Sequence, residues 1–234
     1  MLMIKNMNYH YPDKTKNAIV NVNLNINKGV VYVLLGENGS GKTTTLKLIT
    51  GLLPVSKDTV FVDFKDISLD PLSAKQKIAF MPDWNILYDN LTVYEYIELF
   101  ANLWGIKDYK KDIEYYLNIF NLNHKANVFC KNLSQGMKQK TVFIASIIHK
   151  PKLLIMDEPF TGLDISASKK IKLFLKDYAS QGNAVLITTH ILPFAESVAD
   201  YIGFLKEGKI VFEKHISEVD ENLEQYLIEN FYNE

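Results

Sequence analysis

A glycine-rich loop between an apolar run and a helical segment constrains the fold of this chain most strongly. The run Val30–Leu35 is too short for a buried helix and predicts a buried strand. Residues 36–43, Gly-Glu-Asn-Gly-Ser-Gly-Lys-Thr, match the phosphate-binding pattern G-x-x-x-x-G-K-S/T without a departure. A helix is expected from about Lys42 to Thr50, with Gly51 ending it. A strand, a glycine loop and a helix in this order predict a site for a nucleoside triphosphate.

The residue types of this loop suit a phosphate group. Glycines let backbone N–H groups curl around phosphate oxygens, and the start of a helix adds the positive end of its dipole. Lys42 is expected to reach the β- and γ-phosphates, and the Thr43 hydroxyl is expected to bind Mg²⁺. The predicted nucleotide-binding residues of this segment are Asn38, Gly39, Ser40, Gly41, Lys42, Thr43 and Thr44.

A second apolar run ends in two carboxylates. Residues 153–156 are Leu-Leu-Ile-Met, and Asp157 and Glu158 follow them. A buried strand that ends in Asp places a carboxylate beside Mg²⁺ in nucleotide hydrolases, so we predict Asp157 as a metal ligand. Glu158 could polarise the attacking water. An acidic pair at a strand end is also common as solvated surface or as a helix cap, and the glycine loop is what favours the catalytic interpretation.

The rest of the chain alternates short apolar runs with helical patterns, which predicts an α/β fold. Residues 20–26 alternate apolar side chains with asparagine, as in a half-buried strand. Further strands are expected at 153–156 and 184–188, and Tyr201–Ile210 predicts a hairpin that turns at Glu207 and Gly208. Between these strands, about 60 residues have helical spacing, with helices expected at 93–100, 112–120 and 134–148.

Composition excludes several classes of protein. The 234 residues carry a net charge of −1, so no strong field favours nucleic acid. All 26 basic residues are lysines, which excludes an arginine finger from this chain. Cys130 is the single cysteine, which excludes an internal disulfide and suits a reducing cytoplasm. The apolar stretches are far shorter than the roughly 18–20 residues that span a bilayer. We therefore expect a cytoplasmic protein that would serve a membrane through a partner.

Four further segments carry a resemblance to a known family. Residues 133–137, Leu-Ser-Gln-Gly-Met, are similar to the LSGGQ signature of ABC-type ATPases. Residues 161–164, Thr-Gly-Leu-Asp, resemble the D-loop of that family, and Thr188-Thr189-His190 resembles its switch histidine segment. Tyr11 stands 25 residues before Gly36, where the family has an aromatic residue that stacks on adenine. Together with the glycine loop and the acidic pair, these segments resemble the nucleotide-binding subunit of an ABC transporter.

The resemblance implies a fold and its division. It implies a P-loop NTPase core of the ABC ATPase type, with an N-terminal antiparallel β subdomain and an inserted α-helical subdomain. The whole chain, 1–234, would be one ABC ATPase domain. The catalytic core with the β subdomain would comprise 1–83 and 151–215, and 84–150 would form the helical subdomain with the signature. Residues 216–234 would form an acidic C-terminal helix, expected to be only a solvated surface.

The resemblance also implies roles for single residues. Ser134 and Gly136 at a helix start would face an ATP molecule held by a second copy, so that two subunits enclose two ATP molecules, and Asp164 of the D-loop would also be a nucleotide-binding residue. His190 would contact the γ-phosphate and share catalysis with Glu158 and Lys42; outside this motif, a histidine after two threonines is an ordinary capping residue. Tyr11 would bind the base, although Tyr9 would share its face in a strand.

Two departures from the family pattern stand out. Asp83 occupies the place of the usual glutamine after the strand that precedes the helical block. A carboxylate there can bind Mg²⁺ or orient water, so Asp83 is a candidate metal ligand. Gln135 and Met137 replace a glycine and a glutamine of the signature, whereas Ser134 and Gly136 are retained. We therefore expect an active site with altered dimerisation.

These features lead to a functional hypothesis. The chain would be an ATP- and Mg²⁺-dependent ATPase subunit that dimerises on ATP, with a copy of itself or a related subunit, and drives a separate permease from the cytoplasmic face of the membrane. The sequence looks most like ATPases of the ABC-2 export group, including Ecs-type subunits, so the cargo would be a peptide, lipid or drug. Residues 84–88, Trp-Asn-Ile-Leu-Tyr, would contact the permease or pack the helical lobe on the core.

Two alternatives stay open. A non-catalytic subunit that binds ATP for regulation is compatible with the altered signature, although Glu158 and His190 are retained. A soluble ABC ATPase of translation or DNA metabolism would carry two ATPase units or a long coiled-coil arm, and this chain shows neither.

Overall fold

The structure is a computed structural model that describes residues 1–83, 87–160, 164–219, 223–227 and 229. Its centre is a six-stranded sheet with the strand order β10-β9-β3-β8-β7-β6. Strands β9, β3, β8, β7 and β6 run parallel, and β10 pairs antiparallel with β9. The strands are β3 (Val31–Leu35), β6 (Ile78–Met81), β7 (Leu153–Asp157), β8 (Ala184–Thr189), β9 (Tyr201–Lys206) and β10 (Lys209–His215). Because β3, β7 and β8 are parallel neighbours, the residues that follow them meet at one edge.

A second sheet is antiparallel and comes mostly from the N-terminal part of the chain, as predicted. Its order is β2-β1-β4-β5. The strands are β1 (Leu2–Tyr9), β2 (Ile19–Ile26), β4 (Val60–Val62) and β5 (Lys65–Asp66). The alternation in β2 buries Val22, Leu24 and Ile26 and exposes the asparagines between them, because successive side chains of a strand point to opposite faces.

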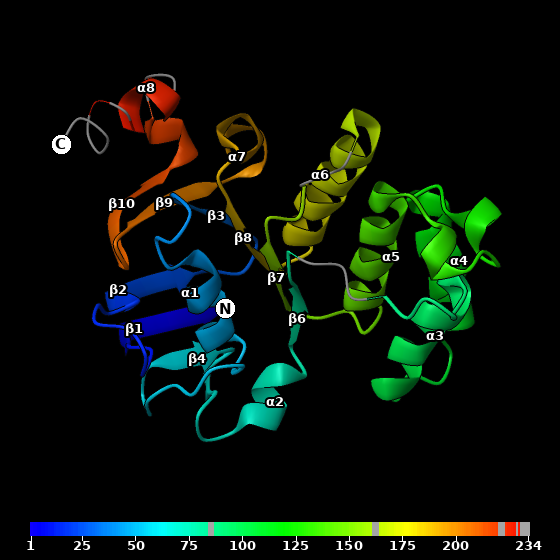
Figure 1. Cartoon of the computed structure of the whole chain (residues 1–234), viewed down its shortest axis with the longest axis horizontal. Helices are drawn as coiled ribbons and strands as arrows, with labels where there is room; N and C mark the ends of the chain where they lie inside the picture. The colour runs from blue at the N-terminus through cyan, green and yellow to red at the C-terminus, as the bar shows by residue number, and fades with distance from the viewer. Residues whose placement is uncertain (84–86, 161–163, 220–222, 228, 230–234) are drawn as a thin grey trace.

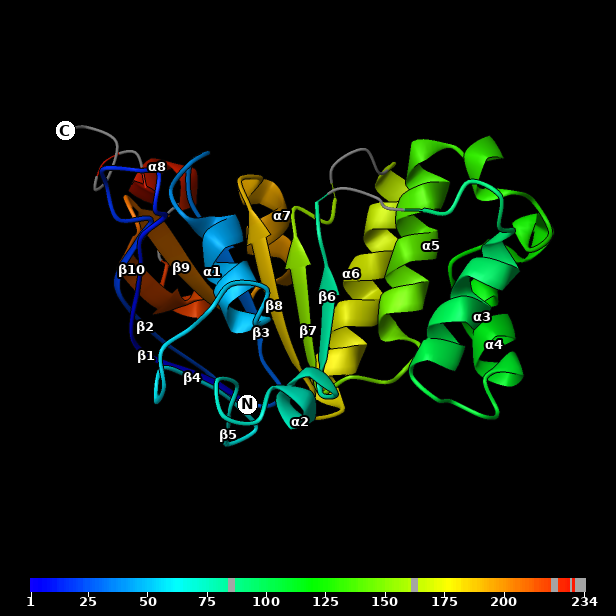
Figure 2. The same ribbon diagram turned by 60° about the horizontal axis from the view of Figure 1, so that its bottom comes forward.

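Helix α1 (Lys42–Ile49) packs between the two sheets. Leu46, Leu48 and Ile49 are fully buried in a cluster that also contains residues of β1, β2, β4 and the central sheet. Burying each of these side chains stabilises the fold by about 1.5–3 kcal/mol. This packing fixes the helix start, and with it the glycine loop, against the carboxyl ends of the central strands (Figure 2).

Three helices form a lobe between β6 and β7 in the chain: α3 (Val93–Leu103), α4 (Lys110–Ile119) and α5 (Gln135–Ile147). Figure 1 shows them grouped at one end of the molecule, beside α6 (Ile165–Ser180). A capping box begins α3, because Glu95 accepts from the Thr92 backbone N–H at 2.8 Å while the Thr92 hydroxyl accepts from the Glu95 N–H at 3.2 Å. Gly105, with φ of 69°, closes the helix where only a glycine adopts this conformation easily.

The remaining helices cover the sheet and its rim. Helix α6 buries Ile171 and Leu175, and α7 (Leu192–Val198) buries Ala195 and Val198 in the same core cluster. A short helix, α2 (Pro71–Lys75), precedes β6. Three 3₁₀ turns complete the described elements: η1 (Asn123–Lys125), η2 (Cys130–Asn132) and η3 (Ile216–Glu218).

The structure confirms the late hairpin and corrects the C-terminal segment. Glu207 and Gly208, with φ of 47° and 77°, form the turn between β9 and β10. The expected helix over 216–234 is wrong at its start, because residues 216–218 form η3 and the described α-helix is α8 (Leu223–Leu227). Leu223 and Leu227 are buried in the core, so this segment is not only a solvated surface. They lie four residues apart, on one face of the helix.

Candidate functional site

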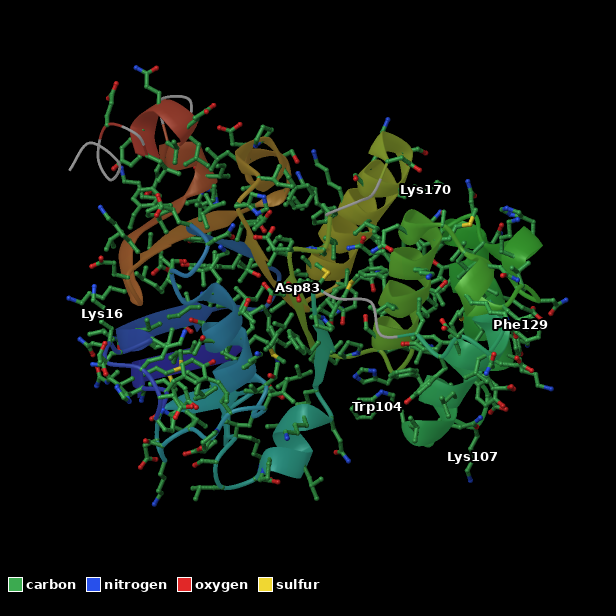
Figure 3. The ribbon with its side chains drawn as sticks, viewed as in Figure 1. Lys16, Asp83, Trp104, Lys107, Phe129 and Lys170 are labelled. Carbon is green, nitrogen blue, oxygen red and sulfur yellow. The ribbon has the colours of Figure 1, made fainter. Side chains whose placement is uncertain are left out.

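A cavity of about 840 Å³ lies at the start of α1 and at the carboxyl ends of the central strands. Lys16 and Asp83 both line it; in Figure 3 Lys16 lies at the left edge of the view and Asp83 near its middle. Most residues predicted to bind the nucleotide lie on its wall: Tyr11, Asn38, Gly39, Gly41, Lys42, Thr43 and Thr44, with Asp83 and Glu158 beside them.

Two glycines of the loop are packed too closely for a side chain. A Cβ at Gly36 would lie 2.4 Å from the Leu205 carbonyl oxygen, and one at Gly41 would lie 2.7 Å from the Ala18 carbonyl oxygen. Ser40, also in this loop, is buried, and its hydroxyl has no hydrogen-bond partner in the described part of the chain. Bare backbone and an unsatisfied hydroxyl are what a loop needs in order to bind phosphate oxygens, so the residues fit a nucleotide.

Lys42 lies inside this loop. Its Nζ donates to the carbonyl oxygens of Gly36 at 2.6 Å and Glu37 at 3.1 Å, and lies 3.9 Å from Oε1 of Glu158. Burial lowers the pKa of Lys42, while the nearby charges of Glu158, Asp157 and Glu37 raise it. The lysine therefore places a cation at the floor of the cavity, where phosphates would lie.

Asp157 is almost completely buried at the end of β7. Its Oδ2 accepts from the Thr43 hydroxyl at 2.7 Å, and its Oδ1 accepts from the Thr188 hydroxyl at 2.5 Å. The carboxylate and the Thr43 oxygen therefore meet, as a shared Mg²⁺ would require, and their chemistry suits that hard cation. Searched over the described residues, no group of three or more His, Cys, Asp or Glu side chains forms a metal site of its own.

Glu158 is held in a conformation that is unusual for its residue type. Its φ is 46°, in the left-handed region that costs a non-glycine residue on the order of 1 kcal/mol or more. The Thr189 hydroxyl donates to its Oε2 at 3.0 Å, and Nδ1 of His190 lies 2.9 Å from its Oε1. The Glu158 backbone N–H donates to the Thr188 carbonyl at 3.0 Å. These contacts fix the direction of the carboxylate, which faces both Lys42 and the cavity.

His190 lies beyond the cavity wall. It lines a smaller hollow of about 210 Å³ on the other side of the glycine loop, together with Gly36 and Asn38. Its side chain is 55% exposed, so its free face is open to a second molecule. The structure brings His190 to Glu158 but not into the main cavity.

Tyr11, rather than Tyr9, faces the cavity. Strand β1 ends at Tyr9, so the two rings do not follow strand alternation; they meet edge to face at 4.9 Å. The Tyr11 hydroxyl lies 3.2 Å from Oγ1 of Thr44, which ties the ring to α1. Lys14 places its Nζ 5.7 Å from the centre of the Tyr11 ring.

Several residues of the site were missed in the sequence. Lys14, Lys16 and Asn17 of the β1–β2 loop and Lys209 of β10 line the cavity beyond the tyrosine. The lysines of residues 12–18 were a signal for an anion near this loop, but nothing local showed which way the loop turns. In the sequence, Thr188 and Thr189 stand out only through their place before His190, whereas in the structure the Thr188 hydroxyl donates to Asp157 and the Thr189 hydroxyl donates to Glu158.

The signature residues lie apart from the cavity. Ser134 begins α5, is exposed, and accepts weakly from the Met137 N–H at 3.4 Å. Asp164 begins α6, is exposed, and accepts from the Ala167 N–H at 2.7 Å. Neither of them lines the cavity, and neither does Gly136. The other residues of the D-loop segment, 161–163, and residues 84–86 of the expected permease contact lie outside the described residues.

This geometry defines the site of a P-loop nucleotide hydrolase, with a glycine cradle, a buried lysine, an Asp–Thr pair and a held glutamate. The family model described as "ABC transporter" matches residues 19–161. The lantibiotic transport ATP-binding protein SrtF of Streptococcus pyogenes is 36% identical over 96% of this chain and 95% of its own length. The SkfA peptide export ATP-binding protein SkfE of Bacillus subtilis is 30% identical over 96% of this chain and 93% of its own.

Solved structures agree with the fold. An ATP-binding subunit of an ABC transporter superposes with a TM-score of 0.90 at 27% identity, over 98% of both chains. A dimeric ATP-binding cassette in a post-hydrolysis state, bound to ADP and Pi, superposes with a TM-score of 0.83 at 27% identity, over 92% of this chain and 99% of that one.

The chain belongs to the ABC transporter family and is an ABC-type ATPase subunit that binds ATP. This confirms the family and the fold predicted from the motifs. Within the described residues, no helix combines the length and the apolar character that a bilayer crossing needs.

Proposed function

We propose that this chain is the MgATP-hydrolysing subunit of a peptide exporter, that two copies dimerise on ATP, and that a separate membrane permease carries the cargo. The observation that carries the proposal is the meeting of Lys42, Asp157 and Glu158 at one glycine cradle. The export of a peptide is inferred from relatives that cover nearly the whole chain and are named for lantibiotic transport and peptide export.

In the proposed reaction, water attacks the γ-phosphorus of ATP and the bond to the β-phosphate oxygen breaks, giving ADP and phosphate. Glu158 orients the water and takes its proton, which suits a carboxylate held by Thr189 and His190. Lys42 and the N–H groups of the loop stabilise the charge on the phosphate oxygens. The hydrogen bond between the Tyr11 and Thr44 hydroxyls keeps the tyrosine ring at the cavity, where it would stack on the adenine base of ATP.

Thr43, Asp157 and Asp83 are the residues that would hold Mg²⁺. When bound, the ion neutralises charge on the β- and γ-phosphates. Asp157 keeps two hydroxyl donors, which hold its carboxylate in one orientation for the ion. Asp83 lines the cavity and adds a negative charge to that of Asp157. Asp83→Asn should therefore raise the Mg²⁺ concentration needed for half-maximal activity.

The proposed dimer is supported by the position of the signature and D-loop residues outside the cavity. Ser134, Gly136 and Asp164 are outside it, and Ser134 and Asp164 are exposed at helix starts, where N–H groups favour an anion. In the proposed dimer these residues face the γ-phosphate in the cavity of the second copy. The permease partner would hold the subunit at the cytoplasmic face of the membrane.

A test of the proposal compares the wild type with the Glu158→Gln variant. We expect Mg²⁺-dependent ATP hydrolysis by the wild type, loss of that activity on chelation with EDTA, and retained ATP binding by the variant. In cells, the variant should also abolish the appearance of at least one peptide in the medium, measured by mass spectrometry. Unchanged secreted peptides with altered lipids would overturn the choice of cargo, and normal hydrolysis by the variant would overturn the role of Glu158.

The non-catalytic alternative is not favoured by the geometry. A subunit that only binds ATP has no need of a strained glutamate held by a threonine and a histidine.

A further inference from the structure

One buried side chain of the helical lobe reaches the segment that carries Glu158. Gln139 of α5 is 2% exposed, and its Nε2 donates to the carbonyl oxygen of Pro159 at 2.7 Å. Pro159 is itself buried and follows Glu158 directly. The bond therefore joins the signature helix to the backbone just after the proposed catalytic carboxylate.

This backbone needs a restraint. Glu158 has φ of 46°, a conformation that a non-glycine residue keeps only when its surroundings impose it. The contacts of Glu158 with Thr188, Thr189 and His190 come from β8 and the residue after it. Gln139, which comes from the helical lobe, binds the carbonyl oxygen of Pro159, the residue that follows Glu158.

The position of Gln139 on α5 gives this contact a second consequence. Ser134 begins the helix, and Gln139 lies five residues later on the same rigid element. A displacement of α5 when Ser134 meets a phosphate would be transmitted to Pro159 through the amide, because a helix moves as a unit and the bond is buried.

We propose that Gln139 is a positioning residue: its amide fixes the left-handed turn at Glu158 and couples the direction of that carboxylate to the signature helix. The inference rests on the proposed function of Glu158 as the group that takes the proton from water. Gln139 itself touches no reacting atom.

The chemistry of the amide sets the test. Its Oε1 is buried and has no hydrogen-bond partner in the part of the chain that the structure describes. Gln139→Met keeps the volume of the side chain, removes the donor to Pro159 and removes the unsatisfied acceptor as well. Asn183→Leu is a matched control, because the Asn183 amide is also buried and donates to a backbone carbonyl, that of Tyr178 at 3.1 Å, outside the cavity lining.

The first measurement is ATP hydrolysis and ATP affinity of the full chain in each variant. For Gln139→Met we expect kcat to fall about tenfold, because the variant loses one hydrogen bond that orients a catalytic group. The Kd for ATP should stay within about twofold of the wild-type value. For Asn183→Leu we expect both quantities to stay within about twofold. Equal losses of kcat in the two variants would show general destabilisation and would overturn the proposal.

The second measurement separates positioning from structure. In a chain that already carries Glu158→Gln, mispositioning of the base no longer matters, so adding Gln139→Met should change the residual kcat by less than about twofold. An additive tenfold loss would contradict the coupling to Glu158. If Glu158→Gln alone hydrolyses ATP normally, the proposed function fails; if only Gln139→Met does, the positioning role fails and the proposed function stands.

A second variant covers the case in which Gln139→Met does not fold. Gln139→Glu has nearly the same size, and its carboxyl can donate to the Pro159 carbonyl only when it is protonated. Its kcat, expressed relative to the wild type at the same pH, should rise as the pH is lowered from about 8 to about 6, because burial favours the neutral carboxyl. A ratio that does not change with pH would overturn the proposal.

Discussion

Two regions of the molecule are proposed to bind phosphate: the cavity, and the exposed surface of Ser134 and Asp164, called here the signature surface. They are built differently. At the glycine loop, Lys42, Asp157 and Glu158 are buried or nearly so and are tied to one another or to neighbouring strands. On the signature surface, Ser134 and Asp164 are exposed, and each hydrogen bond described for them goes to its own helix. This difference supports the proposal that one half of the reaction site is assembled within the chain, whereas the other half would be presented to a second copy.

The largest effect that sharpens this comparison is expected at Glu158. Glu158→Gln keeps the size of the side chain and one acceptor oxygen but removes the carboxylate that takes the proton, so kcat should fall by about 10²–10⁴-fold while ATP still binds. Steady-state hydrolysis and a binding titration measure the two quantities. Glu114→Gln, the same change on the exposed surface of α4, should leave both unchanged. A similar fall in ATP affinity for Glu158→Gln would refute the separation of binding from chemistry.

Lys42→Ala should act on binding itself. The variant removes a cation from the floor of the cavity, and one charge-assisted contact is worth about 1.5–3 kcal/mol, so the Kd for ATP should rise about tenfold to a hundredfold. Lys47→Ala, at the other end of α1, serves as the control. Fluorescence titration with an ATP analogue checks the change, and an unaltered Kd would count against the cradle.

Ser134→Ala should lower the rate of hydrolysis and leave the ATP affinity of the single chain unchanged. Because Ser134 is outside the cavity, the affinity of one chain for ATP should not change, whereas the kcat of the dimer should fall about tenfold through the loss of one hydrogen bond. Ser146→Ala, which removes a hydroxyl bond at the far end of α5, is the control. A loss of ATP affinity in monomeric Ser134→Ala would mean that Ser134 belongs to the ATP site of its own chain, which contradicts the separation of the two regions.

The smallest effect is expected at Asp164. Its carboxylate accepts from the Ala167 N–H at 2.7 Å and caps α6. Asp164→Ala should lower the free energy of unfolding by about 1 kcal/mol, whereas Asp164→Asn, which can still cap, should change it by a few tenths. Urea unfolding distinguishes these outcomes. Equal stability of both variants would show that the cap contributes nothing to the stability of the fold.

The sequence predicts best what is contiguous. The glycine loop, Lys42 and Thr43 lie within one strand–loop–helix unit, so spacing alone defines their chemistry. Glu158 and His190 follow strands of one parallel sheet, and the carboxyl ends of such strands meet at one edge. The sequence therefore indicates that these residues lie close together, and they do meet at 2.9 Å.

Features that depend on distant packing escaped prediction. The sequence alone does not show which of Tyr9 and Tyr11 faces the cavity, because the end of β1 is set by its partner strands rather than by its own residues. Lys209 reaches the cavity only because the β9–β10 hairpin lies beside β3. Leu223 and Leu227 have helical spacing, but the acidic residues around them concealed a buried face.

The most direct measurement mixes two inactive chains. Glu158→Gln damages the cavity, while Ser134→Asp keeps a good helix cap and places a negative charge where a phosphate would bind. In an equimolar mixture, about half of the dimers should contain one chain of each kind, and each of these has one intact composite site. We therefore expect the mixture to recover about a quarter of the wild-type ATPase activity. Activity no higher than the mean of the two separate variants would contradict a site shared between two copies.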